Sequence, residues 1–583
     1  MAKNNIFIVI DSLYYDKTIA STNHPDTMPF LNKLRSEGLT CENMYSEAPY
    51  TEAALVSLLC GIDTLKKGSY IRKLYGKETI METFKNSGYE TFCNCVQPLV
   101  YPSYSYQGLT EEYDNICYNF STLWSYRLDF YSKQYKNTGL DDKTLNVIID
   151  LVEDNFNEWM NFLTSLRDNT QVTSFIYKYI DTTDANKNLE LVNKQFNKFK
   201  KNKLNYIKEL LEKGKDHELF KIHTYELTKR LTDEEKQKLY KRYNKIIKKV
   251  RLKNFINNLL NNRLVLIPKN EYRGLIKAYI NAIYNRFLIG KIKDDPKTRK
   301  AAPSMDATFN HFENWLLKRK NNKPYFAYLH VDDCHSPEIY YTYDTNDFHK
   351  LDEEFSLIED YLKHIPKGYK GSMSYDISLR YADLCLKRLY NFLDENKMLD
   401  DVNIFICADH GSSYSFDPYR SNYVNNAHRE NYNMPFVIWS KEIKHQVIKG
   451  FYNTKDIPAT ILDLNNIKIP NEYDGISILK NNAREYVLLE NVCGGCPDYN
   501  LRDFMLGIRN NNYLVVMNLN LHKDFTDGKI ISIYDLKTDK RELYNLKDTI
   551  DKTVISKELA IIEKEFNALK ADMAKNNFLN VKR

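Results

Sequence analysis

The apolar run Ile6–Ile10 (IFIVI) constrains the fold of this chain more than any other segment. A continuous run of this kind, rich in β-branched residues, is typical of a strand that is buried on both faces, as in a parallel sheet covered by helices. The run ends at Asp11, so a carboxylate lies at the carboxyl end of the predicted strand. Open α/β sheets bind their ligands at that edge, which makes Asp11 a candidate site residue.

Helical and strand patterns alternate after Asp11. The segment TMPFLNKLRSEG has helical spacing and a glycine stop, TCENMYSEAP predicts a second strand with its loop, and a helix is expected from Thr51. The segment KETIMETFKNSGYETFCNCV then predicts a helix, a glycine stop and a strand. This order predicts an α/β fold in which helices sandwich a mostly parallel sheet.

The same rhythm returns late in the chain. A strand is predicted over Tyr325–Val331, and Asp332, Asp333 and His335 come directly after it. A long amphipathic helix is predicted further along the chain. The buried strand in VNIFICADHGSS ends in Asp409-His410-Gly411, and NMPFVIWS predicts one more strand. After Asn491, antiparallel strands with turns and a closing helix are expected.

These patterns divide the chain into three parts. We predict a catalytic core from 1–112 and 322–490, a mainly helical insertion at 113–321, and a smaller C-terminal α+β portion at 491–583. The insertion carries amphipathic, Lys-rich segments, for example NKQFNKFKKNKLNYIKELLEKGKD and DEEKQKLYKRYNKIIKKVRLKNFINNLL. Their charged faces are interpreted as solvated surface, with an anionic partner as the alternative.

Composition narrows the functional classes. The 83 basic and 77 acidic residues leave a net charge of +6, too small a surplus to indicate nucleic-acid binding. The single CxxC of Cys493 and Cys496 has no second pair, so a structural zinc site is not favoured there. Cys60, Cys385 and Cys407 lie in apolar runs and are interpreted as buried thiols.

Location and assembly are less constrained. No signal peptide or membrane-length segment is recognised, so a cytoplasmic protein without a transmembrane segment is expected. The sequence carries no signal for an oligomeric state.

Thr51 has two interpretations. It precedes the good helix formers Glu52-Ala53-Ala54-Leu55, so it is placed to act as a helix N-cap. A hydroxyl at a helix N-terminus also lies in a positive field that suits a phosphoryl group, so a nucleophile is the alternative interpretation of Thr51. The segment by itself favours the cap.

The joint placement of Asp11, Thr51, Asp409 and His410 favours chemistry. All four fall at predicted strand ends or at the following helix start. Carboxylates, an imidazole and a hydroxyl are ligands for a divalent metal ion, and two carboxylates brought together without a cation would repel each other. The sequence therefore predicts a metal site.

The ordered motifs resemble the sulfatase-like branch of the alkaline phosphatase superfamily. IFIVIDSL resembles its first metal-binding strand, APYTEAALVSLLCG its nucleophile segment, HVDDCHSP its substrate-side histidine segment and ICADHGSS its second metal-binding strand. DIPATILDL, YDGISI and IYDLKTDKRELYNLKD resemble its distal landmarks. The resemblance covers both ends of the chain, places the predicted insertion outside the match, and implies an alkaline-phosphatase-like fold.

The nucleophile segment departs from that of sulfatases. The matching position is Thr51, whereas sulfatases carry Cys or Ser followed by Pro and Arg for conversion to formylglycine. A Thr is similar to the phosphodiesterases and phosphotransferases of the superfamily. The resemblance then implies that an ion held by Asp11, Asp409 and His410 contacts the Thr51 oxygen, which attacks phosphorus and forms a phosphothreonine.

The resemblance also implies further site residues. His335 is expected to bind or protonate the substrate. His428 is expected near the substrate or, with Asp332 and Asp333, in a second metal site, and Arg429 is a candidate for holding substrate oxygens or an ordinary surface residue. One divalent ion (Mn, Zn, Mg or Ca) is favoured over two.

Three functions remain open at this point. The favoured one is a metal-dependent phosphoesterase or phosphotransferase acting on a small-molecule, glycan or lipid-precursor phosphoester. The alternatives are a sulfatase that works without formylglycine and a non-catalytic binding protein on the same fold. A nucleic-acid partner is not expected.

Overall fold

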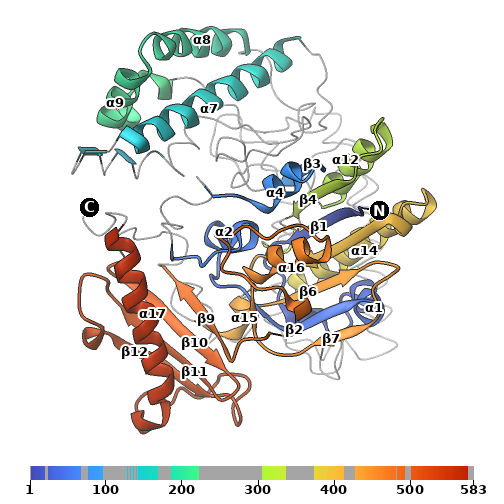
Figure 1. Ribbon diagram of the computed structural model, residues 1–583, viewed down its shortest axis with the longest axis vertical. Helices are drawn as coiled ribbons and strands as arrows, with labels where there is room; N and C mark the ends of the chain where they lie inside the picture. Colours follow the sequence, from blue (N-terminus) through green and yellow to red (C-terminus); the bar gives the residue numbers. More distant parts are fainter. Residues whose placement is uncertain are drawn as a thin grey trace, which may run out of the picture.

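The computed structural model of the chain describes the ranges 2–19, 24–66, 77–95, 142–168, 185–221, 305–331, 333–335, 373–412, 427–480, 482–492 and 501–575, with a few residues between 128 and 140. Figure 1 shows three groups of elements: a central sheet with its helices, a C-terminal sheet with one long helix, and a helical group formed by α7, α8 and α9.

The central sheet holds eight described strands in the order β3-β4-β1-β5-β6-β2-β7, with β8 paired to β2. Their bounds are β1 (Asn4–Ile10), β2 (Leu39–Tyr45), β3 (Glu90–Cys95), β4 (Tyr325–Val331), β5 (Val402–Cys407), β6 (Asn433–Trp439), β7 (Gln446–Ile448) and β8 (Tyr452–Asn453). Strands β3, β4, β1 and β5 run parallel, and β6 is antiparallel to both of its neighbours, β5 and β2. The mostly parallel α/β fold expected from the sequence is confirmed.

Helices cover both faces of this sheet. Thr91 of β3 is level with Phe326 of β4, so Phe326 and Phe92 point to opposite faces. Phe326 stacks on Phe84 of α4 (Ile80–Asn86), with ring centroids 4.3 Å apart, whereas Phe92 packs against Phe312 of α12 (Met305–Lys318). Helices α4 and α12 therefore lie on opposite faces, which is why the core strands are apolar on both sides.

Each of the other longer helices of the core belongs to one of these two layers. Helices α1 (Pro29–Glu37) and α14 (Met373–Glu395) pack with α12, and α2 (Thr51–Cys60) and α16 (Asp456–Leu464) pack with α4. The short helix α15 (Arg429–Tyr432) precedes β6. Single 3-10 turns are η1 (Tyr15–Thr18), η6 (Gly214–Asp216), η7 (Glu218–Lys221), η9 (Leu399–Asp401), η11 (Ile478–Lys480), η13 (Phe525–Asp527) and η14 (Lys552–Ile555).

The C-terminal sheet is antiparallel, in the order β12-β11-β10-β9, and α17 (Ser556–Lys575) packs on β10. Its strands are β9 (Tyr486–Asn491), β10 (Phe504–Asn510), β11 (Tyr513–Leu519) and β12 (Lys529–Asp535). The expected C-terminal α+β portion with antiparallel strands is confirmed. The sheet begins with β9, before the boundary predicted at 491.

The helical group consists of α7 (Asp142–Asp168), α8 (Ala185–Lys201) and α9 (Lys203–Lys213), which pack on one another. The Lys-rich segment NKQFNKFKKNKLNYIKELLEKGKD is helical, and it is divided between α8 and α9 at Asn202, whose side chain accepts a hydrogen bond from the Asn205 amide and caps α9. The pattern from 233 onward, like Cys493 and Cys496, lies outside the described residues. None of the described helices combines the length and apolar character that crossing a bilayer requires.

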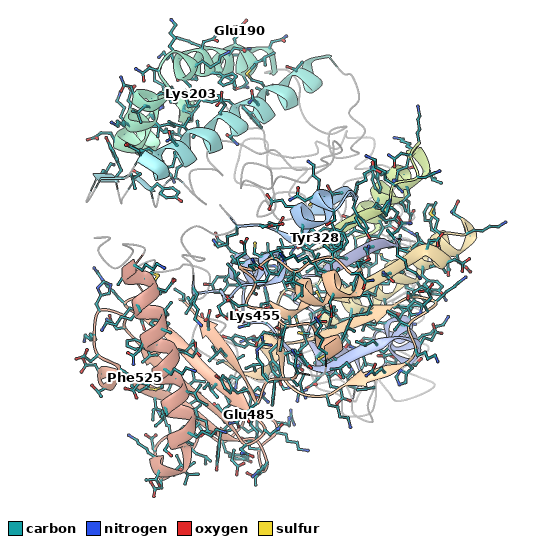
Figure 2. The ribbon with its side chains drawn as sticks, in the orientation of Figure 1. Glu190, Lys203, Tyr328, Lys455, Glu485 and Phe525 are labelled. Atoms are coloured by element: carbon teal, nitrogen blue, oxygen red, sulfur yellow. The ribbon has the colours of Figure 1, made fainter. Side chains whose placement is uncertain are left out.

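A buried charge cluster joins the core to the C-terminal sheet. Lys455 lies 2.8 Å from Glu47 Oε1 and also pairs with Asp63, and Lys66 lies 2.8 Å from Asp63 Oδ2. Glu490 of β9 is 5% exposed, and its Oε2 has no hydrogen-bond partner within the described ranges. Figure 2 labels Lys455 among the densely packed side chains of the core. Lys66 also pairs with Glu565 at 3.0 Å, so the carboxylates of the cluster outnumber its two lysines.

We expect Glu490→Gln to stabilise the fold increasingly as pH rises above about 4.5. Burial, followed by the charges of Glu47 and Asp63, raises the pKa of Glu490 well above its ordinary value of 4.5, and Lys66 and Lys455 only partly oppose this shift. A raised carboxyl pKa means that the folded state holds a proton which the unfolded chain releases, so stability falls as pH rises above about 4.5. Removing the group should abolish that loss, which is at most about 1.4 kcal/mol per pH unit.

The measurement is Tm from pH 5 to pH 8. Glu490→Gln should gain over the wild type as pH rises, and the gain should shrink toward pH 5. The control is Glu485→Gln, because the Glu485 side chain is 81% exposed in its pair with Lys557 and should show no pH-dependent gain. A variant less stable than the wild type across the whole range would contradict the prediction.

Candidate active site

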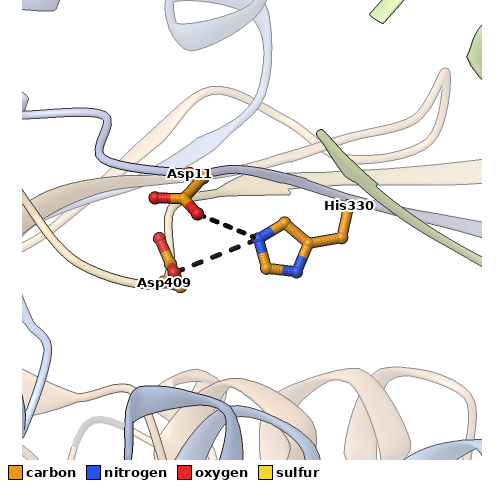
Figure 3. Close-up of side chains that lie close together, drawn as sticks. All are labelled: Asp11, His330 and Asp409. Atoms are coloured by element: carbon orange, nitrogen blue, oxygen red, sulfur yellow. Dashed lines mark ion pairs between the residues drawn. The ribbon is translucent and has the colours of Figure 1, made fainter. Parts of the chain in front are cut away.

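Three neighbouring strands place the candidate side chains on one face of the sheet. Val9 of β1 is level with His330 of β4 and with Cys407 of β5. Because alternate residues share a face, Asp11 and Asp409 follow on the same side as His330. Figure 3 shows the three side chains converging, with His330 Nε2 4.0 Å from Asp11 Oδ2 and 4.0 Å from Asp409 Oδ2.

Asp11 is fully buried and continues the β1–β4 ladder, since its amide donates to the Val331 carbonyl at 2.8 Å. Its Oδ1 accepts from the Ser12 hydroxyl at 2.9 Å. Ser12 has a left-handed φ of 63°, and its carbonyl accepts from the Tyr375 hydroxyl at 2.6 Å. A non-glycine residue held in this region is costly, so the surrounding contacts fix the turn after β1.

Asp409 accepts hydrogen bonds from described residues through only one of its oxygens. Its Oδ1 accepts from the backbone amides of Ser12 at 3.2 Å and His410 at 2.8 Å. Its Oδ2 is buried and has no hydrogen-bond partner in the part of the chain that the structure describes. The carboxylate is therefore oriented by one oxygen and offers the other to the site.

His410 directs its Nε2 toward the two carboxylates. Its Nδ1 lies 2.6 Å from the Gly411 carbonyl, which accepts from an N–H, so Nε2 is the unprotonated nitrogen of the neutral ring. Nε2 lies 3.6 Å from Asp11 Oδ1 and 3.5 Å from Asp409 Oδ2. Burial disfavours the charged imidazole, but the charges of Asp409 and Asp11 outweigh it and raise the pKa of His410.

His330 is the functional candidate that sequence reasoning missed. It is fully buried, its Nδ1 lies 3.1 Å from the Tyr328 hydroxyl, and its Nε2 has no hydrogen-bond partner among the described residues. Burial lowers its pKa to about 4 despite the nearby charge of Asp409, so the ring is neutral at pH 7. The available signal was a single histidine in an otherwise apolar strand, one residue before the strand's end.

Thr51 is the first residue of α2 and does not cap it. The N-cap is Tyr50, and no side chain makes a capping hydrogen bond there, so the capping interpretation is wrong. The Thr51 hydroxyl instead donates to Asp11 Oδ2 at 3.0 Å and lies 3.4 Å from His410 Nε2. The Thr51 hydroxyl bonds to Asp11 instead of capping its own helix, because the end of β1 places the Asp11 carboxylate within hydrogen-bond distance.

The residues present fit a divalent cation. Two buried carboxylates and a neutral imidazole offer ligand atoms within 4.8 Å of one another, in the group Asp11, His330 and Asp409. His330 Nε2 and Asp409 Oδ2 are both buried without a hydrogen-bond partner, and a cation between them would satisfy both atoms. Oxygen and imidazole donors suit Zn, Mn or Mg. Among the described residues this is the only such group.

The other predicted site residues lie in different surroundings. His335 follows β4 and is half-buried. The pKa of His330 is lowered first by burial and then by the charges of His410 and His335, whereas the charge of Asp409 raises it. Asp333 is buried and accepts from the Met305 amide at 2.8 Å, so it starts α12. Asp332 lies outside the described residues.

His428 and Arg429 contact acidic partners of their own. His428 Nδ1 lies 3.1 Å from Glu542 Oε2, and the Arg429 amide donates to the same oxygen at 2.9 Å. The Arg429 guanidinium pairs with Asp16 at 2.8 Å and with the Asn433 side chain. These contacts tie the start of α15 to neighbouring segments. The predicted substrate contacts of both residues stay predictions.

The chain is similar to known proteins in sequence and in fold. The sulfatase family model matches residues 3–172 and 254–467, more than half of the chain. The match enters the predicted insertion from both sides and leaves out only 173–253 between its two stretches. The expectation that all of 113–321 lies outside the family match is therefore wrong. No curated protein sequence matches the chain.

Several solved structures are similar over nearly the whole chain. One from Bacteroides thetaiotaomicron, described under the metabolism of multiple glycosaminoglycans, is 12% identical with a TM-score of 0.51, covering 99% of this chain and 100% of that chain. Phosphonate monoester hydrolase of Agrobacterium radiobacter is 13% identical with a TM-score of 0.47, covering 97% and 96%. A protein in the alkaline phosphatase superfamily from Vibrio parahaemolyticus is 13% identical with a TM-score of 0.46, covering 99% and 88%. At these identities the likeness concerns the fold alone.

We expect Mn²⁺ to stabilise the protein through this site. A cation between Asp11 and Asp409 removes their repulsion, and a ligand at a hundred times its Kd adds about 2.7 kcal/mol of stability. Tm should therefore rise on adding Mn²⁺ and fall on adding a chelator. Asp409→Asn should lose the Mn²⁺-dependent rise.

Asp383→Asn is the matched control for that prediction. Asp383 is also buried and also accepts from two backbone amides, those of Phe30 and Leu31, but it lies outside the candidate site. It should keep the full Mn²⁺-dependent rise in Tm. A wild-type Tm that is indifferent to Mn²⁺, Zn²⁺ and Mg²⁺ would contradict the metal site.

His330→Gln should weaken Mn²⁺ binding by roughly tenfold to a hundredfold, the usual effect of removing a group that supports a metal site. Isothermal titration calorimetry of the metal-stripped protein measures the change. His217→Gln is the control, because His217 is also buried but lies in the helical group after α9. Equal Mn²⁺ affinity of His330→Gln and wild type would exclude His330 from the site.

Proposed function

Because the chain belongs to the sulfatase family, we propose that it is a metal-dependent enzyme that cleaves or transfers a phosphoester group with Thr51 as its nucleophile. The observation that carries this proposal is the position of the Thr51 hydroxyl. Thr51 as a residue is 7% exposed. Its hydroxyl donates to Asp11 Oδ2 at 3.0 Å and lies 3.4 Å from His410 Nε2. A buried hydroxyl beside a carboxylate and an imidazole has the neighbours of an activated nucleophile.

The start of α2 suits a phosphoryl group. Thr51 is the first helical residue, and the ten-residue helix begins without a side-chain cap. The first amides of a helix have no intrahelical acceptor, and the helix dipole adds partial positive charge there. Oxygens of a substrate phosphate placed over Thr51 would accept from these amides.

In the first step, Thr51 Oγ1 forms a bond to phosphorus and the bond to the leaving oxygen breaks. The Thr51 proton is already directed at Asp11 Oδ2, which receives it. His335, after β4, is proposed to hold a phosphoryl oxygen or to protonate the leaving oxygen. The product is a phosphothreonine at position 51.

In the second step, water or an acceptor hydroxyl attacks phosphorus and the bond to Thr51 Oγ1 breaks. The proton of the attacking group passes to a carboxylate of the site, and a proton returns to Thr51. Water as the acceptor gives a hydrolase, and an alcohol gives a transferase. The same residues serve both outcomes.

Asp11, Asp409, His410 and His330 would hold the cation. When bound, a divalent cation supplies Lewis acidity and balances the charge that collects on the phosphoryl oxygens. Asp409 and His410 are held in place by backbone contacts through Oδ1 and Nδ1, so their free atoms are already oriented before any ligand arrives. One cation is favoured over two, since the described residues form one group of this kind.

Thr51 also favours phosphoesters over sulfate esters. The family route to sulfate ester cleavage uses formylglycine made from Cys or Ser, and a Thr cannot be converted to it. A sulfatase that uses the Thr hydroxyl directly is the alternative, because the family is named for sulfate esters. The two are separated by assaying aryl phosphate, phosphodiester and aryl sulfate substrates side by side.

We expect Thr51→Ala to lower kcat on phosphoesters by roughly three orders of magnitude or more, as the loss of a nucleophile does. Its Mn²⁺ affinity should change far less, because Thr51 is one contact among several. Acid-quenched wild-type enzyme should carry a phosphoryl group on the peptide that contains Thr51, as read by mass spectrometry. Wild-type turnover by Thr51→Ala would exclude the nucleophile.

Thr79→Ala is the matched control, because Thr79 is a true N-cap. Its side chain accepts from the Glu82 amide, and the Glu82 carboxylate bonds back to the Thr79 amide. Its loss should cost about 1 kcal/mol of stability and leave kcat unchanged. Turnover of sulfate esters alone by the wild type would overturn the phosphoester assignment.

A further inference from the structure

Glu542 of the C-terminal portion is a buried carboxylate with three donors, none of which belongs to the candidate metal site. Its Oε2 accepts from the Arg429 amide at 2.9 Å and lies 3.1 Å from His428 Nδ1, and its Oε1 pairs with Arg509 of β10. Burial would raise its pKa, but Arg509, with His428 and the Arg429 amide, lowers it to about 2. The side chain is therefore an anion at neutral pH.

Two of these three contacts hold the start of α15. His428 is the residue before the helix and Arg429 is its first residue. Arg509, the third contact, also lies over the Tyr45 ring at the end of β2, 5.4 Å from its centroid. Glu542 thus joins the C-terminal sheet to α15 and to the core.

Helix α15 contacts the segments that carry three candidate site residues. The Gly411 amide, next to His410, donates to the Asn431 carbonyl at 2.9 Å. The Ser46 amide, in the loop before Thr51, donates to the Tyr432 carbonyl at 2.7 Å. The Arg429 side chain pairs with Asp16, in the turn after Asp11, at 2.8 Å.

The contact with Gly411 leaves no room for displacement. A Cβ on Gly411 would lie 2.0 Å from the Glu430 carbonyl oxygen, so the backbone of α15 lies directly against that of Gly411. The Gly411 carbonyl in turn accepts from His410 Nδ1 at 2.6 Å and sets the orientation of the ring. A shift of α15 is therefore transmitted to the His410 imidazole.

The backbone of Glu542 shows that the carboxylate is held against a local preference. Its φ is +55°, in the left-handed region that glycine adopts readily and other residues rarely do. Such a conformation persists when surrounding contacts over-determine it. Here those contacts are the ones that the carboxylate makes to α15 and Arg509.

We propose that Glu542 is a positioning residue for the active site, through which the C-terminal portion fixes α15 and thereby the segments that carry Asp11, Thr51 and His410. The inference rests on the proposed function for its effect on turnover, but its effect on metal binding is independent of any substrate. The competing interpretation is that Glu542 only joins the two parts of the chain. That interpretation predicts a lower Tm with an unchanged site.

The test uses the full chain with Glu542→Gly and Glu542→Gln. Glycine suits the left-handed backbone and removes the carboxylate, so it separates the loss of the contacts from backbone strain. Glutamine keeps the shape and one acceptor oxygen but loses the charge, and it should restore part of the wild-type behaviour. Tm is measured for every variant. Mn²⁺ Kd by calorimetry, and kcat and KM on an aryl phosphate, are measured at a temperature at which all variants are folded.

Glu558→Ala is the matched control. Glu558 is 4% exposed, belongs to the same portion of the chain, and accepts from the Asn510 side chain of β10 at 2.7 Å. It should lower Tm and leave Mn²⁺ Kd and kcat at wild-type values.

For Glu542→Gly we expect Mn²⁺ Kd to rise roughly tenfold and kcat to fall with a smaller change in KM, because the reacting groups are misplaced and substrate contacts remain. Lower Tm with wild-type Mn²⁺ Kd and kcat would overturn the proposal, as would an equal rise in Kd for Glu558→Ala. If Thr51→Ala keeps full turnover, the proposed function fails, and the Mn²⁺ Kd comparison still decides the role of Glu542.

Discussion

The approach of two buried carboxylates, Asp11 and Asp409, is the constraint on which the site depends. Both follow adjacent parallel strands, both are fully buried, and backbone hydrogen bonds hold Asp409 in one orientation. Burying two like charges this close is unfavourable unless a cation or charged donors compensate. Within the described ranges, the neutral His330 and the Asp409 Oδ2 that lacks a hydrogen-bond partner suit a cation at this place.

The rest of the architecture serves that arrangement. The β1–β4 and β1–β5 registers bring Asp11, His330 and Asp409 to one face of the sheet, and helix α2 on that face begins with Thr51. The fold therefore brings a hydroxyl and the positive end of a helix to the place where the carboxylates meet. This geometry suits attack on a phosphoryl group, which needs positioning and charge balance more than covalent chemistry from the protein.

The C-terminal portion adds a second level of support. Glu542 holds α15 from the side of the C-terminal sheet, and α15 contacts the backbone beside His410 and before Thr51. In Figure 1, α15 is drawn between the strands of the core and those of the C-terminal sheet. The C-terminal portion supplies none of the candidate metal ligands, but through α15 it is linked to the segments that carry them.

The sequence by itself determined the fold class, the main strands and the residues at their ends, because apolar periodicity and helix stops are local signals. It could not decide the role of Thr51: local propensity favoured a cap, and only the arrival of Asp11 from a distant strand gave the hydroxyl another partner. It could not show His330, since a strand buried on both faces has no alternation to mark one side chain as special. It could not show Glu542 either, because that contact joins residues 113 positions apart. Such contacts follow from strand register and packing, which only the tertiary structure sets.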